Sequence, residues 1–121
     1  MEYLEAQDIH HLAMNHVGKE LEALGYEFLA INSQLKKHPQ FVCVDKETNT
    51  LHFVLVNAVF YPDNPQYFDE SFLKTFKEHA VAKKAKLLFA GLGFANAENF
   101  EKPIAKNEDY ILNYEGIKEI F

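Results

Sequence analysis

The sequence predicts one α/β domain over residues 1–121, with a mixed central sheet flanked by helices. Two segments carry apolar residues at the three- and four-residue steps of amphipathic helices. Between them, residues 51–60 are almost continuously apolar, as in a strand that is covered on both faces. The strand–helix–strand order that follows implies a right-handed crossover between parallel strands. A chain of 121 residues has the usual size of one domain with one core.

The first helix is expected over residues 8–24, with Asp8 as the N-cap and Gly25 just after the end. Its apolar residues recur on one face, which we expect to point inward: Ile9, Leu12, Ala13, Val17, Leu21 and Leu24. Residues 26–32 are rich in aromatic and branched side chains and predict a strand. The polar residues 33–39 then predict a loop.

A hairpin is predicted from the apolar runs 41–44 and 51–60, because the polar residues 45–50 between them favour a turn. The longer run, 51–60, is expected at the centre of the sheet. Pro62 and Pro65 then exclude a regular element directly after it.

A second helix is expected over residues 69–84, with Asp69 as its N-cap. The apolar residues expected to face inward are Phe72, Leu73, Phe76, Ala80 and Val81. Residues 86–95 predict a buried strand and residues 110–114 a further one. Residues 116–121 predict a closing turn of helix.

Composition narrows the classes of function. A hydrophobic fraction of 48% excludes a disordered chain, and a formal net charge of -6 argues against a bare duplex-binding domain without excluding nucleic acid. The start has no secretory-signal pattern and no apolar run is long enough to span a bilayer, so we expect a cytoplasmic protein that does not bind membranes. The one cysteine, Cys43, lies in an apolar run and is expected to be a buried thiol.

The first helix, the segment 25–32 that begins with Gly-Tyr and ends with Asn, the hairpin and the central strand resemble the YraN-like family of small bacterial proteins. The order of elements agrees across nearly the whole chain. That family has the restriction-endonuclease or Holliday-junction-resolvase fold, the PD-(D/E)xK fold, so the resemblance implies a restriction-endonuclease-like αβββαβ core. It also implies a site with an Asp on the first hairpin strand and a Glu-x-Lys on the second.

The family's catalytic side chains are absent from the matching positions. Its Asp falls on Gln40, its Glu on Leu55 and its Lys on Asn57, and the Glu that such proteins often carry on the first helix falls near Met14. Leucine offers no lone pair to a metal, and asparagine cannot supply the charge of a lysine. A shift of one residue would present His52, Val54 and Val56, again without a carboxylate. We therefore expect no catalytic residue, metal ligand or cofactor here.

Other acidic and histidine residues offer weaker candidates. Asp45 and Glu47 lie in the predicted turn, where solvated charge is the simpler interpretation, and the stretch 98–101 is also acidic. The spacing of His10, His11 and His16 is typical of histidines on the surface or flank of a helix rather than of a zinc site, and His38, His52 and His79 are dispersed. A nucleophilic Cys43 with His52 as its base competes with simple core packing, which its apolar neighbours favour.

Three further features carry open alternatives. Five lysines on and after the second helix are candidate phosphate contacts, or form a solvated helix face: Lys74, Lys77, Lys83, Lys84 and Lys86. The Gly-x-Gly of Gly91 and Gly93 lies within a strand and favours a close approach of backbone or a ring over a phosphate loop. Tyr61, Tyr67 and Phe68, around the proline loop, either stack on a ligand or clamp the loop.

The leading hypothesis is a catalytically inactive nuclease-fold domain with a binding or assembly role. A second is a metal-dependent nuclease, using Mg²⁺ or Mn²⁺, whose acids have moved to Asp45, Glu47 or residues 98–101. A third is a protein-interaction subunit in which Leu55 and its neighbours enlarge an apolar surface. Two partner classes stay open: nucleic acid, and a second copy of the chain in a homodimer.

Overall fold

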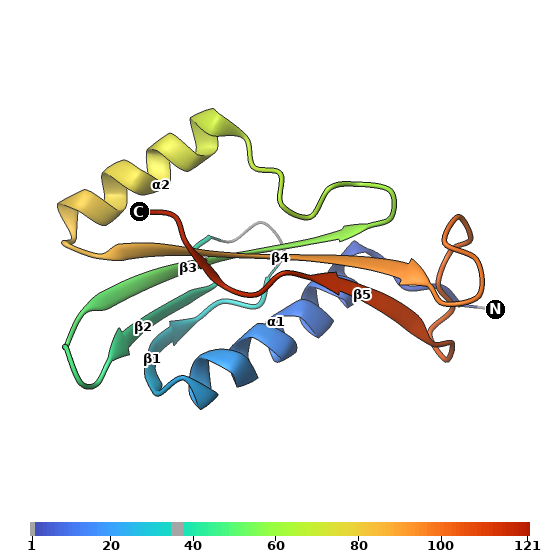
Figure 1. Ribbon diagram of the computed structural model, residues 1–121, viewed down its shortest axis with the longest axis horizontal. Helices are drawn as coiled ribbons and strands as arrows, with labels where there is room; N and C mark the ends of the chain where they lie inside the picture. Colours follow the sequence, from blue (N-terminus) through green and yellow to red (C-terminus); the bar gives the residue numbers. More distant parts are fainter. Residues whose placement is uncertain (1, 35–37) are drawn as a thin grey trace.

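The computed structural model describes residues 2–34 and 38–121, and it confirms an α/β fold with a mixed sheet flanked by two helices (Figure 1). The elements follow one another as α1 (Ala6–Ala23), β1 (Tyr26–Ile31), β2 (Phe41–Asp45), β3 (Leu51–Phe60), α2 (Glu70–Ala82), β4 (Lys86–Asn96), β5 (Tyr110–Tyr114) and β6 (Lys118–Glu119). The predicted loop over residues 33–39 falls partly on residues 35–37, which lie outside the described residues. No helix within the described part of the chain is long and apolar enough to cross a membrane.

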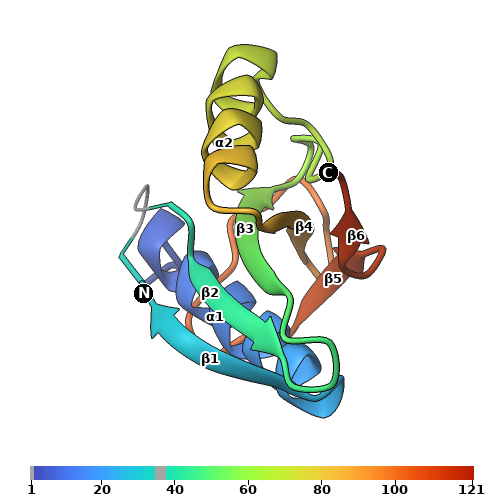
Figure 2. The same ribbon diagram turned by 90° about the vertical axis from the view of Figure 1, so that its left-hand side faces the viewer.

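The six-stranded sheet has the order β1-β2-β3-β4-β5, with β6 also paired to β4. Strands β3 and β4 are parallel, and every other pair is antiparallel. The predicted hairpin and the central place of β3 are thus confirmed. Helix α2 connects the two parallel strands and covers one face of the sheet, while α1 covers the other (Figure 2).

Helix α1 begins two residues before the predicted start. Its N-cap is Glu5, and the prediction of Asp8 was wrong: Asp8 lies in the first turn, where its Oδ2 accepts a hydrogen bond from the Glu5 backbone N–H at 2.7 Å. Gly25 follows the helix with a φ of 92°, as expected for the residue after a helix end. Leu24 is exposed rather than inward, because the helix ends at Ala23 and the last turn no longer faces the core.

Helix α2 has the predicted N-cap, since Asp69 Oδ1 accepts a hydrogen bond from the Phe72 N–H at 3.1 Å. The helix ends at Ala82, two residues before the predicted end. Val81 is exposed, against the prediction, because it follows Ala80 directly and so lies about 100° around the helix from that buried residue.

The closing helical turn predicted over residues 116–121 was wrong. This segment contains β6, which pairs with β4 through Leu88 opposite Glu119. Strand β5 pairs only with the second half of β4, from Leu92 to Asn96, which leaves the edge of the first half unpaired. Because unpaired backbone groups on a buried strand are costly, the C-terminal segment forms a strand along that edge.

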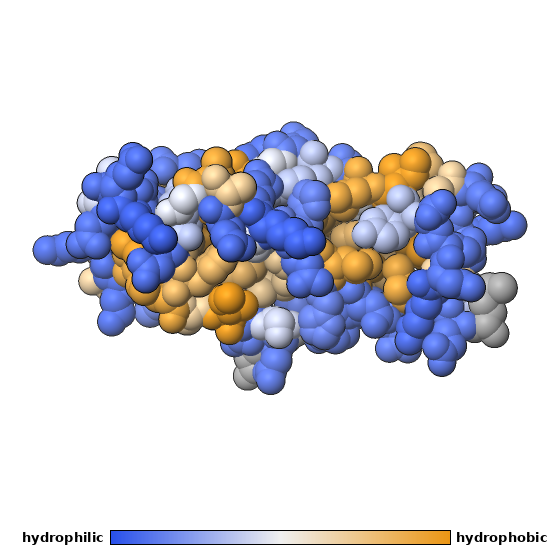
Figure 3. Space-filling model, turned by 90° about the horizontal axis from the view of Figure 1, so that it is seen from below, coloured by the Kyte–Doolittle hydropathy of each residue, from blue (hydrophilic) through white to orange (hydrophobic). Residues whose placement is uncertain are grey.

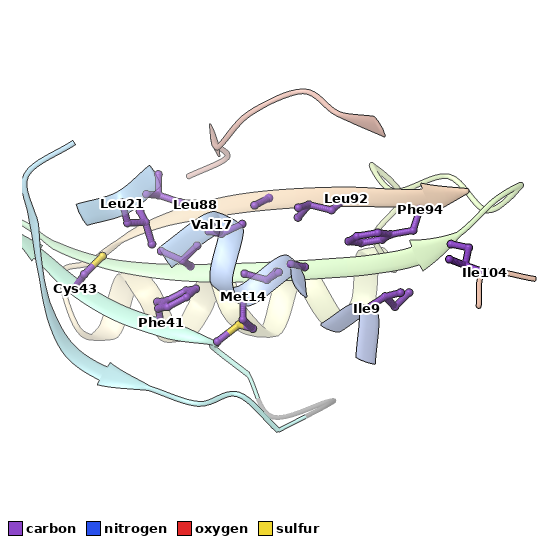
Figure 4. Packing of buried hydrophobic residues seen from close by; sticks show 14 residues of the cluster. Ile9, Met14, Val17, Leu21, Phe41, Cys43, Leu88, Leu92, Phe94 and Ile104 are labelled. Carbon is purple, nitrogen blue, oxygen red and sulfur yellow. The ribbon is translucent and has the colours of Figure 1, made fainter. Parts of the chain in front are cut away.

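The core lies in two layers, one on each face of the sheet. Residues of α1 such as Met14 and Val17 pack toward Phe41 of β2 and Leu92 of β4 (Figure 4). The second layer lies under α2 and contains Leu55. On the side that carries α1, apolar patches lie among hydrophilic residues (Figure 3).

Candidate functional site

The structure does not gather the four positions at which the resemblance to the YraN-like family implies a site. Met14 is buried in the layer between α1 and the sheet, whereas Leu55 is 0% exposed in the layer under α2. Asn57 lies two residues after Leu55 and so on the same face of β3. Gln40 directly precedes β2. Met14 is therefore not gathered with Leu55 and Asn57 around one point.

Gln40 extends the pairing between β2 and β3. Its backbone N–H donates to the Val54 carbonyl at 3.0 Å, and its side-chain Oε1 accepts from the Val56 N–H at 2.8 Å. The side-chain Nε2 lies 2.6 Å from Nδ1 of His38. Just before β2 begins, the Gln40 side chain thus supplies the acceptor that a backbone carbonyl would supply within a regular strand pair. This is a structural role.

Asn57 holds the loop between β3 and α2. Its Nδ2 donates to the Pro65 carbonyl at 3.0 Å and to the Tyr67 carbonyl at 3.4 Å. On the neighbouring strand β4, the Gly91 carbonyl accepts from Gln66 Nε2 at 3.2 Å. These contacts fix the loop on the same face of the sheet as α2.

The Gly-x-Gly of β4 permits the close approach that the sequence indicated. A Cβ atom on Gly91 would lie 2.1 Å from the carbonyl oxygen of Pro65, and one on Gly93 would lie 3.3 Å from Pro65 Cγ. No side chain fits between Gly91 and the loop. This interpretation of the two glycines is confirmed, and they are part of a contact between strand and loop.

A cavity of about 500 Å³ lies between this loop, the carboxyl-terminal half of β3 and the start of α2. We call it the β3–α2 groove. Its lining residues are Asn57, Val59, Asp63, Asn64, Tyr67, Phe68, Asp69 and Phe72. In open α/β sheets, ligands bind near the carboxyl ends of parallel strands, which is where this groove lies.

The three aromatic residues singled out near the prolines have different roles. Phe68 clamps the loop, because its ring meets Phe89 edge-on at 4.3 Å and stacks on Phe72 at 5.6 Å. Tyr61 meets Phe100 edge-on at 5.4 Å. Tyr67 is 67% exposed and leaves its ring on the wall of the groove.

The candidate relocated acids occupy opposite ends of the sheet. Asp45 ends β2 and its Oδ1 accepts from the Glu47 N–H at 2.9 Å within the hairpin turn, whereas residues 98–101 follow the far end of β4. Strand β3 spans about 30 Å between these ends. Among the described residues, no group of three or more His, Cys, Asp or Glu side chains is placed to hold a metal ion.

The histidines of α1 differ from the expectation in one case. His11 and His16 are exposed, but His10 is only 2% exposed, so its assignment to the surface was wrong. Its Nε2 has no hydrogen-bond partner among the described residues. Burial lowers the pKa of His10, and the nearby His11 and His38 lower it further. His10 therefore favours the neutral form.

Cys43 lies directly opposite His52 in the β2–β3 pairing, as the sequence indicated. Burial raises the pKa of the Cys43 thiol to about 11, which keeps it protonated near neutral pH. The His52 ring meets Tyr26 edge-on at 4.9 Å, and its Nδ1 lies 3.0 Å from the Thr50 carbonyl. These contacts favour core packing over a nucleophilic role.

None of the five candidate phosphate-contacting lysines is among the residues that line the groove. Lys74, Lys83 and Lys84 are exposed, Lys77 is half-buried, and Lys86 pairs with Glu119 at 3.4 Å. Among the described residues that line the groove, none is basic. Three of the lysines follow the C-terminal end of α2, about 20 Å from the groove at its start.

Comparison with known families gives one match. A family model described as a domain of unknown function, DUF8840, matches residues 7–120, nearly the whole chain. Neither the curated proteins nor the solved structures contain a match.

Proposed function

The chain belongs to the DUF8840 family, and we propose that it is a non-catalytic domain with a nuclease-like fold that serves in binding or assembly. The proposal rests on the contacts that three side chains make at the positions where the resemblance implies a catalytic site. Gln40 is bonded into the sheet, Leu55 is buried in the core and Asn57 holds a loop. Each of these side chains has a structural role, which supports a non-catalytic function.

The arrangement of elements supports a nuclease-like scaffold. Strands β1, β2 and β3 form an antiparallel meander, and β4 adds parallel to β3 after the α2 crossover. With α1 at the start, this is the αβββαβ order that the resemblance to the YraN-like family implies. Because one fold hosts many functions, the activity has to be argued from the site.

Metal-dependent cleavage of a phosphodiester needs acidic oxygens around a hard cation and a nearby positive charge. Leu55 supplies no oxygen. Asn57 is neutral, and its Nδ2 already donates to two loop carbonyls. The chemistry of these residues therefore supports a role that does not include hydrolysis.

The test is a cleavage assay with purified protein, Mg²⁺ or Mn²⁺, and plasmid DNA, single-stranded DNA and structured RNA as substrates. We expect no cleavage above that of a parallel preparation of the Asp45→Asn, Glu47→Gln double variant. Both substitutions keep the size of the side chain and remove its charge, so the variant controls for contaminating nucleases. Reproducible cleavage by the natural protein that the double variant lacks would favour relocated acids and end the proposal.

One version of an assembly role is ruled out. The hypothesis that Leu55 enlarges an apolar surface was wrong, because Leu55 is fully buried under α2. Leu29 and Ile31, on the edge strand β1, are instead each 59% exposed. A homodimer remains a proposal, and so does nucleic acid, for which the lysines on and after α2 are the candidate contacts.

A further inference from the structure

We propose that the β3–α2 groove binds an arginine side chain presented by a basic segment of a partner protein. The inference rests on the proposed binding function and specifies the chemistry of the partner. It is based on the charge, the hydrogen-bonding groups, the aromatic surface and the shape of the groove.

The charge of the groove favours a cation. Asp63 and Asp69 place two carboxylates on its wall, and none of the described lining residues is basic. The start of α2 would by itself attract an anion, because helix N-termini carry partial positive charge. Here Asp69 already accepts the hydrogen bond from Phe72, and Glu70 adds a second carboxylate in the first turn. Phosphate is therefore disfavoured at this end of the helix.

The hydrogen-bonding groups of the groove favour a donor-rich ligand. The two donor interactions of Asn57 Nδ2 orient its amide, and the Oδ1 atom is an acceptor with no partner among the described residues. Asn64 differs, because its Oδ1 already accepts a hydrogen bond from the Gln66 N–H at 2.9 Å. Its side chain therefore offers a ligand the amide nitrogen, which is a donor. A guanidinium group offers five N–H donors and no acceptor, which matches one amide oxygen and two carboxylates.

The aromatic surface favours arginine over lysine. Tyr67 is 67% exposed, and Phe68 and Phe72 contribute further ring surface. Cations are attracted to the faces of such rings, and a planar guanidinium also stacks on them. An ammonium group is more strongly hydrated and does not stack in this way.

The shape favours a side chain that enters from a partner's surface. Pockets for free small molecules enclose most of the ligand, whereas this cavity of about 500 Å³ is an open groove beside the exposed ring of Tyr67. A formal net charge of -6 adds long-range attraction for a basic segment.

The experiment is a titration of ¹⁵N-labelled protein with a short glycine–serine peptide that contains arginines, followed by amide NMR spectra. Matched peptides carry lysine or the uncharged analogue citrulline in place of arginine. We expect the arginine peptide to shift the Asn57 side-chain amide and the backbone signals of Tyr67 and Asp69. The lysine peptide should bind more weakly, and the citrulline peptide should give no shift at these positions.

Three charge-neutralising variants localise the effect. Asp69→Asn keeps a good helix cap, because asparagine caps helices as well as aspartate does. Asp63→Asn removes the second carboxylate. Each is expected to weaken binding of the arginine peptide about tenfold, the factor that corresponds to a charge-assisted hydrogen bond of roughly 1.4 kcal/mol. Glu47→Gln makes the same change of charge in the hairpin turn and should leave the affinity unchanged.

Several outcomes would overturn the inference: shifts that map outside the groove, equal binding of the citrulline peptide, or an equal loss in Glu47→Gln. Free arginine amide binding as tightly as the peptide would also overturn it, because the ligand would then be a small molecule. Absence of both peptide binding and nuclease activity would refute only the arginine site. Nuclease activity that the Asp45→Asn, Glu47→Gln variant lacks, with Mn²⁺ broadening at Asp45 and Glu47, would count against the proposed function as well.

Discussion

Substitution of Gly91 by alanine tests how the β3–α2 loop is held on the sheet. The added Cβ atom would lie 2.1 Å from the Pro65 carbonyl oxygen and 2.7 Å from its carbonyl carbon. Contacts between non-bonded heavy atoms are optimal at about 3.5–4.0 Å, so the loop would have to retreat by more than about 1 Å. Both neighbours are backbone atoms, which cannot move away by changing rotamer.

The expected cost has two parts. Overpacking in a well-packed region destabilises by about 1–3 kcal/mol. Retreat of the loop also stretches the 3.0 Å hydrogen bond from Asn57 Nδ2 to Pro65 and the 3.2 Å bond from Gln66 Nε2 to Gly91, each worth about 1 kcal/mol. The gain of about 0.5–1 kcal/mol from replacing glycine in a strand offsets part of this. We expect a net loss of about 2–4 kcal/mol in the free energy of unfolding.

Urea unfolding measures this free energy, and Gly93→Ala is the matched control. Gly93 lies on the same strand and face, but its added Cβ atom would meet Pro65 Cγ at 3.3 Å, which a shift of a few tenths of an ångström relieves. We expect its effect to stay within about 1 kcal/mol. Equal effects of the two substitutions, or no loss in Gly91→Ala, would refute the close contact between Gly91 and Pro65.

Two predictions concern titrating groups in the core. Because the pKa of Cys43 is raised to about 11, its thiol should be alkylated by iodoacetamide at about pH 8 far more slowly in the folded protein than in urea, and similar rates would contradict its burial. The contribution of Cys43 to the free energy of unfolding is therefore fully present below about pH 9 and is lost as the pH rises through about 11. The pKa of His10 is instead lowered from 6.5, so its contribution to stability is present above that pH and is lost as the pH falls further. Urea midpoints at about pH 5 and pH 7.5 should therefore differ less in His10→Leu than in the natural protein, and an unchanged difference would exclude His10 as a cause.

Elements with a strong local pattern were predictable from the sequence. Residues 51–60 form a buried central strand because nearly every side chain there is apolar, and Asp69 caps a helix because it precedes an apolar periodic segment. The wrong predictions concern segments whose secondary structure depends on contacts with distant parts of the chain. Strand β6 forms because the backbone groups along the first half of one edge of β4 require hydrogen-bond partners. The sequence around Lys118 has no local pattern that predicts this pairing.

Only single residues of the groove, and not the groove itself, could be predicted from the sequence. Asn57, Tyr67 and Phe68 each attracted attention for a separate reason, and Asp69 did so only as a helix cap. Asp63 and Asn64 had no local pattern to mark them. What joins these residues is the contact between Pro65 and Gly91, 26 positions apart in the chain. A Gly-x-Gly within a strand, together with a proline loop elsewhere, was the one available signal of that contact.

On the nuclease-like scaffold that we propose, the residue at position 57 bears on the charge that the groove favours. Where the resemblance places a lysine that would meet a phosphate, this chain has a neutral amide, and Asp63 and Asp69 lie on the same groove. The proposed loss of catalysis and the proposed arginine site together imply that the groove favours a positive charge and does not bind nucleic acid. The exposed lysines Lys83 and Lys84 follow the other end of α2. Any contact with nucleic acid at those lysines would therefore lie on a surface separate from the groove.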